Sequence, residues 1–103
     1  MTQSQIIIKE IIDTPYAVSA EKADKLKSLL ERAIREKRKT QVSFKDLEVV
    51  ITAFLNVAIG ELYKDFSKED IDQYLDFVEM NDNLKELIPM IKERSCNFYT
   101  KNK

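Results

Sequence analysis

The chain has 103 residues, a formal net charge of −1 and 44% hydrophobic residues, which suits one compact domain with its own core. It contains no histidine and a single glycine, so a histidine base, histidine metal ligands and a glycine-rich phosphate loop are excluded. Acid–base chemistry would have to use carboxylates, Tyr or Lys, and these form no recognisable arrangement. We therefore expect no metal, no cofactor and no enzymatic activity.

The single cysteine and the short apolar runs favour a cytoplasmic protein. Cys96 cannot form an intramolecular disulfide, and without a histidine or a second cysteine it is interpreted as a structural or incidental thiol. The longest apolar runs, Ile6–Ile8 and Val49–Ile51, are far too short for a membrane span or a signal sequence. We expect a soluble cytoplasmic protein.

The first expected element is a strand at residues 5–12, because the five isoleucines there are β-branched, and Pro15 ends it. Ser19 is a good N-cap for an amphipathic helix of about five turns. Between Glu21 and Lys39 there are eight basic and four acidic residues. We interpret them as a solvated face and dipole compensation, since no recognition motif supports the alternative of nucleic acid or acidic lipid.

A short strand is predicted at residues 40–44, followed by a turn at residues 45–47. Thr52 is the N-cap candidate for the next helix, whose apolar positions continue to Phe66 as a stripe wide enough to pack on a sheet. Gly60 lies inside that helix, where glycine costs about 1 kcal/mol relative to alanine. We therefore expect the helix to approach the sheet closely at Gly60.

The remaining elements are short. Ser67 can begin a turn of helix, and residues 74–80 are predicted to form the third strand. Asn81 or Asp82 can cap a last helix, in which Pro89 removes one backbone hydrogen bond and is expected to introduce a kink.

The second half of the chain is acidic, with nine acidic and three basic residues between Glu61 and Glu86. Four of the carboxylates are close enough in sequence to suggest a divalent cation site: Glu69, Asp70, Asp72 and Asp76. Their spacing does not match an EF-hand, so a solvated acidic face is the favoured interpretation.

The predicted order is β-α-β-α-β-α, which favours an α/β domain with a largely parallel sheet and helices packed on it. We expect a single domain over residues 1–103, with a core at about residues 5–95 and a flexible polar tail at residues 97–103. No internal repeat or interdomain linker is found.

The central segment, residues 42–62, reads Val-Ser-Phe-Lys-Asp-Leu-Glu-Val-Val-Ile-Thr-Ala-Phe-Leu-Asn-Val-Ala-Ile-Gly-Glu-Leu. It resembles the STAS-like family related to bacterial anti-sigma factor antagonists. In that family a strand ends in Asp-Phe, an acidic and apolar turn follows, and Thr-Ser-Ser-Phe-Leu-Asp-Glu-Ala-Phe-Gly opens a helix. Residues 77–83 look like its third strand and Asn-rich cap. The resemblance covers residues 19–92 and implies a small STAS-like fold.

In the wider STAS group, a serine at the start of this helix is phosphorylated by a partner kinase of the histidine-kinase-like ATPase type, which switches partner binding. Thr52 matches that serine and is the candidate phosphosite, while Ala53 matches a second serine. Ile51 replaces the family's threonine, and Asn56 and Val57 replace its Asp-Glu pair, so the switch is degraded. A hydroxyl at a helix N-terminus suits two roles, N-capping or regulatory phosphorylation.

The resemblance implies a partner-binding edge built from the turn and the start of the helix, at Lys45, Asp46, Glu48, Ala53, Phe54 and Asn56. The leading hypothesis is a regulatory module that binds a kinase-like ATPase or another protein. The alternative is a structural or assembly protein that acts as a homodimer without a switch. The aromatic pair Phe98 and Tyr99 is a candidate anchor either for a partner or for a homodimer. Neither hypothesis involves nucleic acid or a membrane.

Overall fold

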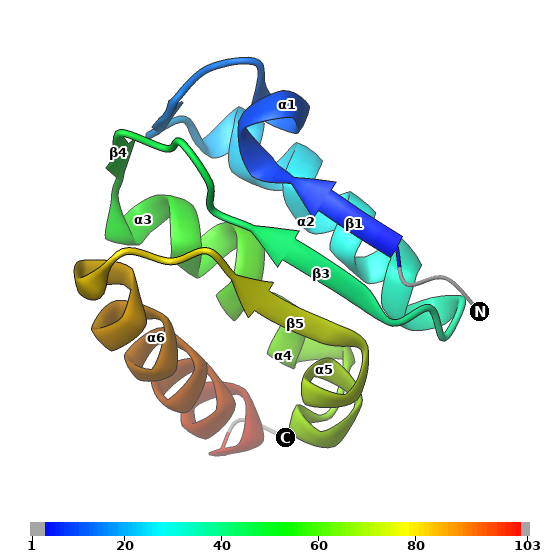
Figure 1. The fold of residues 1–103 in the computed structure, drawn as a ribbon. Helices are drawn as coiled ribbons and strands as arrows, with labels where there is room; N and C mark the ends of the chain where they lie inside the picture. Colours follow the sequence, from blue (N-terminus) through cyan, green and yellow to red (C-terminus); the bar gives the residue numbers. More distant parts are fainter. Residues whose placement is uncertain (1–3, 102–103) are drawn as a thin grey trace.

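The computed structural model describes residues 4–101. Its centre is a parallel three-stranded sheet in the order β1-β3-β5, with β1 at Ser4–Ile7, β3 at Thr40–Ser43 and β5 at Leu75–Val78 (Figure 1). Ser4 lies opposite Thr40, and Thr40 lies opposite Leu75. The predicted α/β class, with parallel strands alternating with helices, is confirmed.

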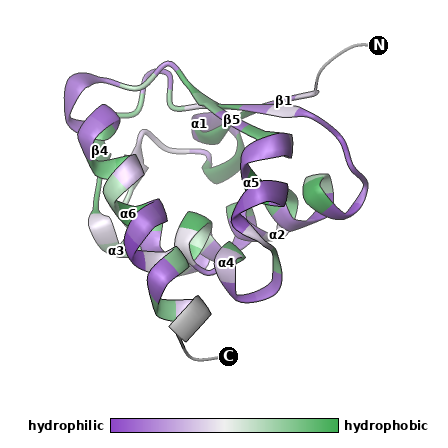
Figure 2. Ribbon diagram, turned by 90° about the horizontal axis from the view of Figure 1, so that it is seen from below, coloured by the Kyte–Doolittle hydropathy of each residue, from purple (hydrophilic) through white to green (hydrophobic). Residues whose placement is uncertain are grey.

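The helices pack on one face of this sheet. Seen from below in Figure 2, the strands run along one side and α2, α4, α5 and α6 lie beneath them. Because successive strand residues point to opposite faces, Val42 lies against the helices and is 0% exposed, whereas the neighbouring Gln41 is partly exposed. No helix of residues 4–101 is long and apolar enough to cross a membrane.

The predicted first strand is too long. Strand β1 ends at Ile7, and the next five residues form a short helix, α1 (Ile8–Ile12), which ends at Asp13 in the left-handed conformation. Ile8 and Ile12 are both 0% exposed and are one helical turn apart, so the same side of α1 faces the core. This packing outweighs the β preference of isoleucine.

The second helix follows its prediction. Helix α2 spans Ala20–Arg35, and the Ser19 side chain accepts a hydrogen bond of 3.3 Å from the backbone N–H of Lys22. Ser19 is therefore the predicted N-cap. The predicted apolar stripe faces the core at Ala23, Leu26, Leu30, Ala33 and Ile34.

In addition to the three-stranded sheet there is a small, two-stranded sheet. It pairs β2 (Tyr16–Ala17) with β4 (Val49–Val50) in parallel, with Tyr16 opposite Val49. The predicted element order, β-α-β-α-β-α, does not include this small sheet. It joins the loop after α1 to the start of the next helix.

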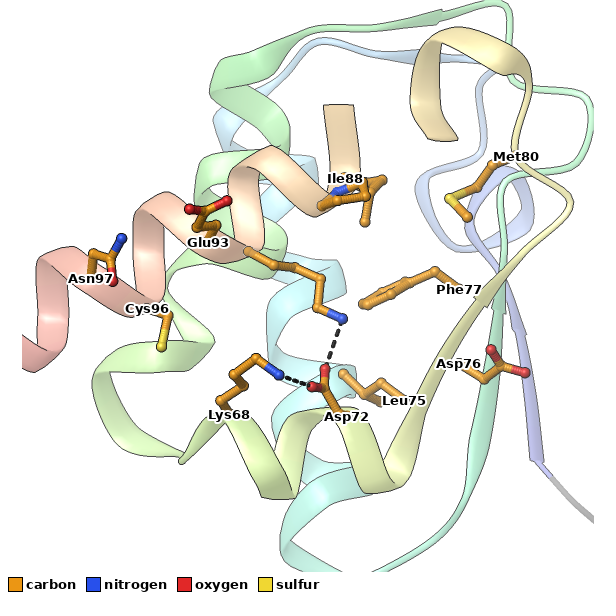
Figure 3. A pocket seen from close by; sticks show the side chains of 12 residues that line it. Lys68, Asp72, Leu75, Asp76, Phe77, Met80, Ile88, Glu93, Cys96 and Asn97 are labelled. Atoms are coloured by element: carbon orange, nitrogen blue, oxygen red, sulfur yellow. Dashed lines mark hydrogen bonds and ion pairs between the residues drawn. The ribbon is translucent and has the colours of Figure 1, made fainter. Parts of the chain in front are cut away.

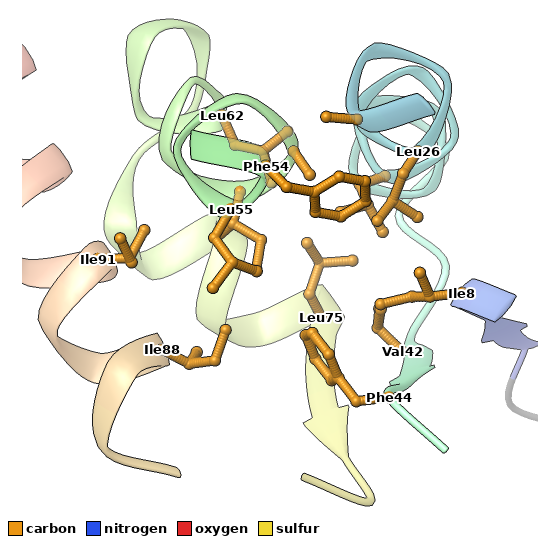
Figure 4. Packing of buried hydrophobic residues seen from close by; sticks show 14 of the residues in the cluster. Ile8, Leu26, Val42, Phe44, Phe54, Leu55, Leu62, Leu75, Ile88 and Ile91 are labelled. Atoms are coloured by element: carbon orange, nitrogen blue, oxygen red, sulfur yellow. The ribbon is translucent and has the colours of Figure 1, made fainter. Parts of the chain in front are cut away.

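The predicted helix after β4 is present but consists of three segments. These are α3 (Thr52–Leu55), a π-helical segment η1 (Asn56–Gly60) and α4 (Leu62–Asp65). Figure 4 shows Phe54 and Leu55 packed among residues from the sheet, α2 and α6. The N-cap is Ile51 rather than Thr52, so the predicted capping role of Thr52 is wrong.

Gly60 makes its close approach to α6, not to the sheet as predicted. A β-carbon on Gly60 would lie 2.6 Å from Ser95 Oγ, well inside van der Waals contact. The backbone of Gly60 has an ordinary negative φ, so the small size of glycine is what this position uses.

The last elements extend further than predicted. Helix α5 (Lys68–Tyr74) is capped by Ser67, and α6 spans Asp82–Lys101 with Asn81 Oδ1 accepting the Leu84 backbone N–H at 2.8 Å. Helix α6 passes through Pro89 and continues over residues 97–101, where a polar tail was predicted. The predicted tail residues 102 and 103 lie outside the described part of the chain.

The contact at Gly60 predicts a coupling between α4–η1 and α6. Gly60→Ala gains helix propensity but meets the Ser95 hydroxyl, whereas in a Ser95→Ala background that oxygen is absent. We expect Gly60→Ala to be more favourable by about 0.5–1 kcal/mol in the Ser95→Ala background, the coupling typical of residues in contact. Chemical denaturation of the four variants measures this. Strict additivity would contradict the close contact.

Candidate functional site

The small sheet exposes four apolar side chains next to the start of α3. By the register of β2 and β4, Tyr16 pairs with Val49, and the Ile51 N–H donates to the Ala17 carbonyl at 3.2 Å, extending the ladder. With a period of two along each strand, Tyr16, Val18, Val49 and Ile51 lie on one side. We call these four residues the β2/β4 face; they are 48%, 46%, 43% and 38% exposed.

The opposite side of this small sheet is directed into the protein. Ala17, which lies between Tyr16 and Val18, is 0% exposed and belongs to the core. Val50, its partner in the register, packs against the core and is half-buried. The β2/β4 face is therefore the outer surface of a sheet whose inner surface is anchored.

Hydrogen bonds hold both ends of the turn that precedes β4. Ser43 Oγ donates to Glu79 at 2.7 Å and accepts the Lys45 backbone N–H at 3.1 Å, while the Glu48 N–H donates to the Pro15 carbonyl at 2.8 Å. Asp46 adopts the left-handed conformation, φ 61°, which closes the turn. The charged side chains of Lys45, Asp46 and Glu48 are exposed beside the β2/β4 face.

The helix residues predicted to bind a partner divide into two groups. Thr52 and Ala53 are exposed directly after Ile51, and Asn56 is exposed one turn further on, where it lines a depression beside α6. Phe54 is only 1% exposed, because it points into the core between the sheet and α2. Its predicted role at a partner-binding surface is therefore wrong.

The apolar half of the site was missed by sequence reasoning. Tyr16 and Val18, and likewise Val49 and Ile51, alternate with residues that turn inward, which is the signature of a half-exposed strand. Each strand is only two residues long, so the pattern is too short to stand out. The pairing of two segments about 30 residues apart, which brings the four side chains together, has no local sequence signal.

The predicted acidic face contains an ion-pair cluster. Lys68 Nζ and Lys92 Nζ each donate to a different oxygen of Asp72, at 2.8 and 2.7 Å. Partial burial alone would raise the pKa of the Asp72 carboxyl, but the hydrogen bonds from Lys68 and Lys92 and their positive charges lower it overall. Within residues 4–101, no three Cys, Asp or Glu side chains form a group that could hold a metal ion.

Two arginines of the basic run contact neighbouring side chains, and Cys96 is partly buried. Arg35 lies 5.5 Å above the Phe66 ring, and Arg38 pairs with Glu36 at 2.9 Å. Cys96 is a free, half-buried thiol on α6.

A model of the STAS-like domain of unknown function (DUF4325) matches residues 22–85, more than half of the chain. The chain is a member of this STAS-like family. The predicted family resemblance is thereby confirmed. The matched region of the STAS-like domain includes the turn, β4 and Thr52, whereas Tyr16 and Val18 precede it. Neither the curated proteins nor the solved structures contain a significant match.

The cap geometry of this STAS-like domain predicts different costs at two hydroxyl residues. Ser19→Ala removes a side-chain cap and should cost about 1 kcal/mol of unfolding free energy, whereas Thr52→Ala removes none and should cost at most about 0.5 kcal/mol. Urea denaturation of both variants distinguishes them. A loss of 1 kcal/mol or more at Thr52 alone would restore its predicted capping role.

The Asp72 cluster predicts a pH-dependent contribution to stability. Because the folded pKa of Asp72 lies below the unfolded value, its contribution is present above about pH 4 and disappears as the pH falls through the folded pKa. Asp72→Asn should therefore destabilise by about 0.5–1 kcal/mol at pH 7, and the difference should shrink progressively as the pH falls below about 4. Denaturation curves of both proteins at each pH test this. A difference that stays constant with pH would refute it.

Proposed function

We propose that this STAS-like domain is a non-enzymatic regulatory module that binds a protein partner through the β2/β4 face and the neighbouring turn. The observation that carries the proposal is the gathering of four exposed apolar side chains within one small surface, bordered by the charges of Lys45, Asp46 and Glu48. Apolar patches rimmed by polar groups mark interaction sites on soluble domains.

The partner we favour is an ATPase of the histidine-kinase-like type. This part of the proposal comes from the resemblance to the wider STAS group, in which a kinase of this type phosphorylates a serine at the start of the corresponding helix. Thr52 supports it, because its hydroxyl is exposed immediately after the β2/β4 face and makes no capping hydrogen bond. A kinase bound to this face would have Thr52 at the edge of its footprint. Phosphate there would add negative charge beside Asp46 and Glu48 and so weaken an apolar contact.

The proposed absence of catalysis is supported by composition. The chain lacks histidine, and Asp72 forms ion pairs with Lys68 and Lys92. Protein binding requires only an exposed surface such as the β2/β4 face. Catalysis would require a nucleophile or an acid–base pair within reach of a substrate.

A second candidate function, assembly as a homodimer, is supported by a different surface. Phe98 on α6 is 60% exposed, and its ring packs edge-on against Tyr99 with 4.9 Å between ring centroids. Exposed aromatic residues are common anchors at protein interfaces. This surface is distinct from the β2/β4 face, so the two functions can be separated by mutation.

The test uses Val49→Asp, which places a charge in the centre of the β2/β4 face, and a matched charge change, Lys25→Glu, on the exposed side of α2. The ATPase is first captured with the tagged chain from its host in the presence of ATP, then purified and titrated by calorimetry. We expect Val49→Asp, and the double variant Asp46→Lys/Glu48→Lys, to weaken binding at least tenfold, while Lys25→Glu binds like the native chain.

Circular dichroism of each variant establishes that the fold is intact. Equal affinity of the folded Val49→Asp variant would overturn the proposed surface. If light scattering instead gives a dimer that Phe98→Asp dissociates, and the chain captures no ATPase, the homodimer is the correct function. Mass spectrometry of Thr52 after incubation with the ATPase and ATP tests the switch separately.

A further inference from the structure

A groove of about 730 Å³ lies along the free edge of the main sheet, between β5 and α6, with the end of α5 at its base (Figure 3). Its size is that of a small-molecule site. None of its lining residues belongs to the β2/β4 face, so it is a separate feature of the surface.

One side of the groove is apolar. Leu75 and Ile88 are 4% and 2% exposed and form the inner wall, while the half-buried Phe77 and Met80 face the open space. Figure 3 shows the Phe77 ring and the Met80 side chain directed toward Ile88 on α6. An aliphatic group placed there would be covered by β5 on one side and by α6 on the other.

The other side carries two cations, the exposed Lys68 and the partly buried Lys92. The ammonium groups of Lys68 and Lys92 both bind Asp72, and Lys92 Nζ also lies 5.8 Å from the centre of the Phe77 ring, at the junction with the apolar wall. Asp72 uses one N–H donor from each ammonium, and each ammonium has three. Two positive charges share one carboxylate, so the Lys68–Asp72–Lys92 cluster taken by itself carries a formal charge of +1.

Two further carboxylates line the groove but are not part of the Lys68–Asp72–Lys92 cluster. Asp76 and Glu93 also line it, but in Figure 3 their carboxylates point away from the two ammonium groups. The cationic end is therefore complementary to a head group with a single negative charge. Asp72 itself shows the geometry required, since its two oxygens bridge Lys68 and Lys92.

We propose that the groove between β5 and α6 binds a small amphiphilic carboxylate, such as a medium-chain carboxylic acid. The carboxylate is held by Lys92 and Lys68, and the aliphatic chain lies on Phe77, Met80 and Ile88. One negative charge neutralises the cluster, whereas the dianion of a phosphate monoester would exceed it. The chain would thus bind a small metabolite at a site that shares no residue with its proposed protein interface.

The probe is sodium decanoate below its critical micelle concentration, titrated into the full chain labelled with ¹⁵N. We expect saturable amide shifts at Phe77, Met80 and Lys92. Lys92→Met should weaken the affinity at least tenfold, Lys92→Arg should largely retain it, and Lys85→Met, an exposed lysine of α6 outside the groove, should leave it unchanged. Met80→Glu, which opposes the aliphatic chain, should also weaken binding without touching the cation cluster.

Two results would overturn the proposal. The first is an absence of saturable shifts in the groove with the native chain. The second is equal binding of decyltrimethylammonium, because a cation of the same chain length would then show that the lysines play no part in recognition. The Lys92→Arg and Met80→Glu variants keep the test informative if Lys92→Met fails to fold.

Discussion

The architecture depends on the burial of the helical segment α3–η1–α4 between its neighbours. Its residues Phe54, Leu55, Ala58, Ile59 and Leu62 are at most 1% exposed, and both α2 and α6 contact η1. At Gly60 the backbone comes so close to α6 that Ser95 occupies the place of a side chain. This close packing determines the position of α6 and therefore its distance from the edge strand β5.

Both candidate surfaces result from that arrangement. Strand β4 pairs with β2 and leads directly into Thr52 at the start of α3. This pairing leaves Tyr16, Val18, Val49 and Ile51 on the outside. Elsewhere on the surface α6 lies beside β5 without closing over it, and the groove with Lys92 and Phe77 remains between them. The two candidate binding surfaces therefore lie at the start of α3 and in the space between β5 and α6.

Much of the fold is predictable because it has local causes. The caps Ser19 and Asn81 form as expected, since a side-chain oxygen three residues before a free backbone N–H needs no tertiary context. Tertiary packing decides the rest: it turns Ile8–Ile12 into a helix, buries Phe54 and brings Gly60 to α6 rather than to the sheet. The β2/β4 face has no local signal, because its two strands are distant in sequence.

If the proposed function is correct, a protein partner covers the β2/β4 face. This is tested most directly by replacing Tyr16 with the photo-crosslinking residue p-benzoylphenylalanine in the native host, with Lys25 on the exposed side of α2 as the control position. We expect a crosslinked product with a kinase-like ATPase from position 16 and none from position 25. A product from position 25 alone, or a product at position 16 that contains only a second copy of the chain, would contradict it.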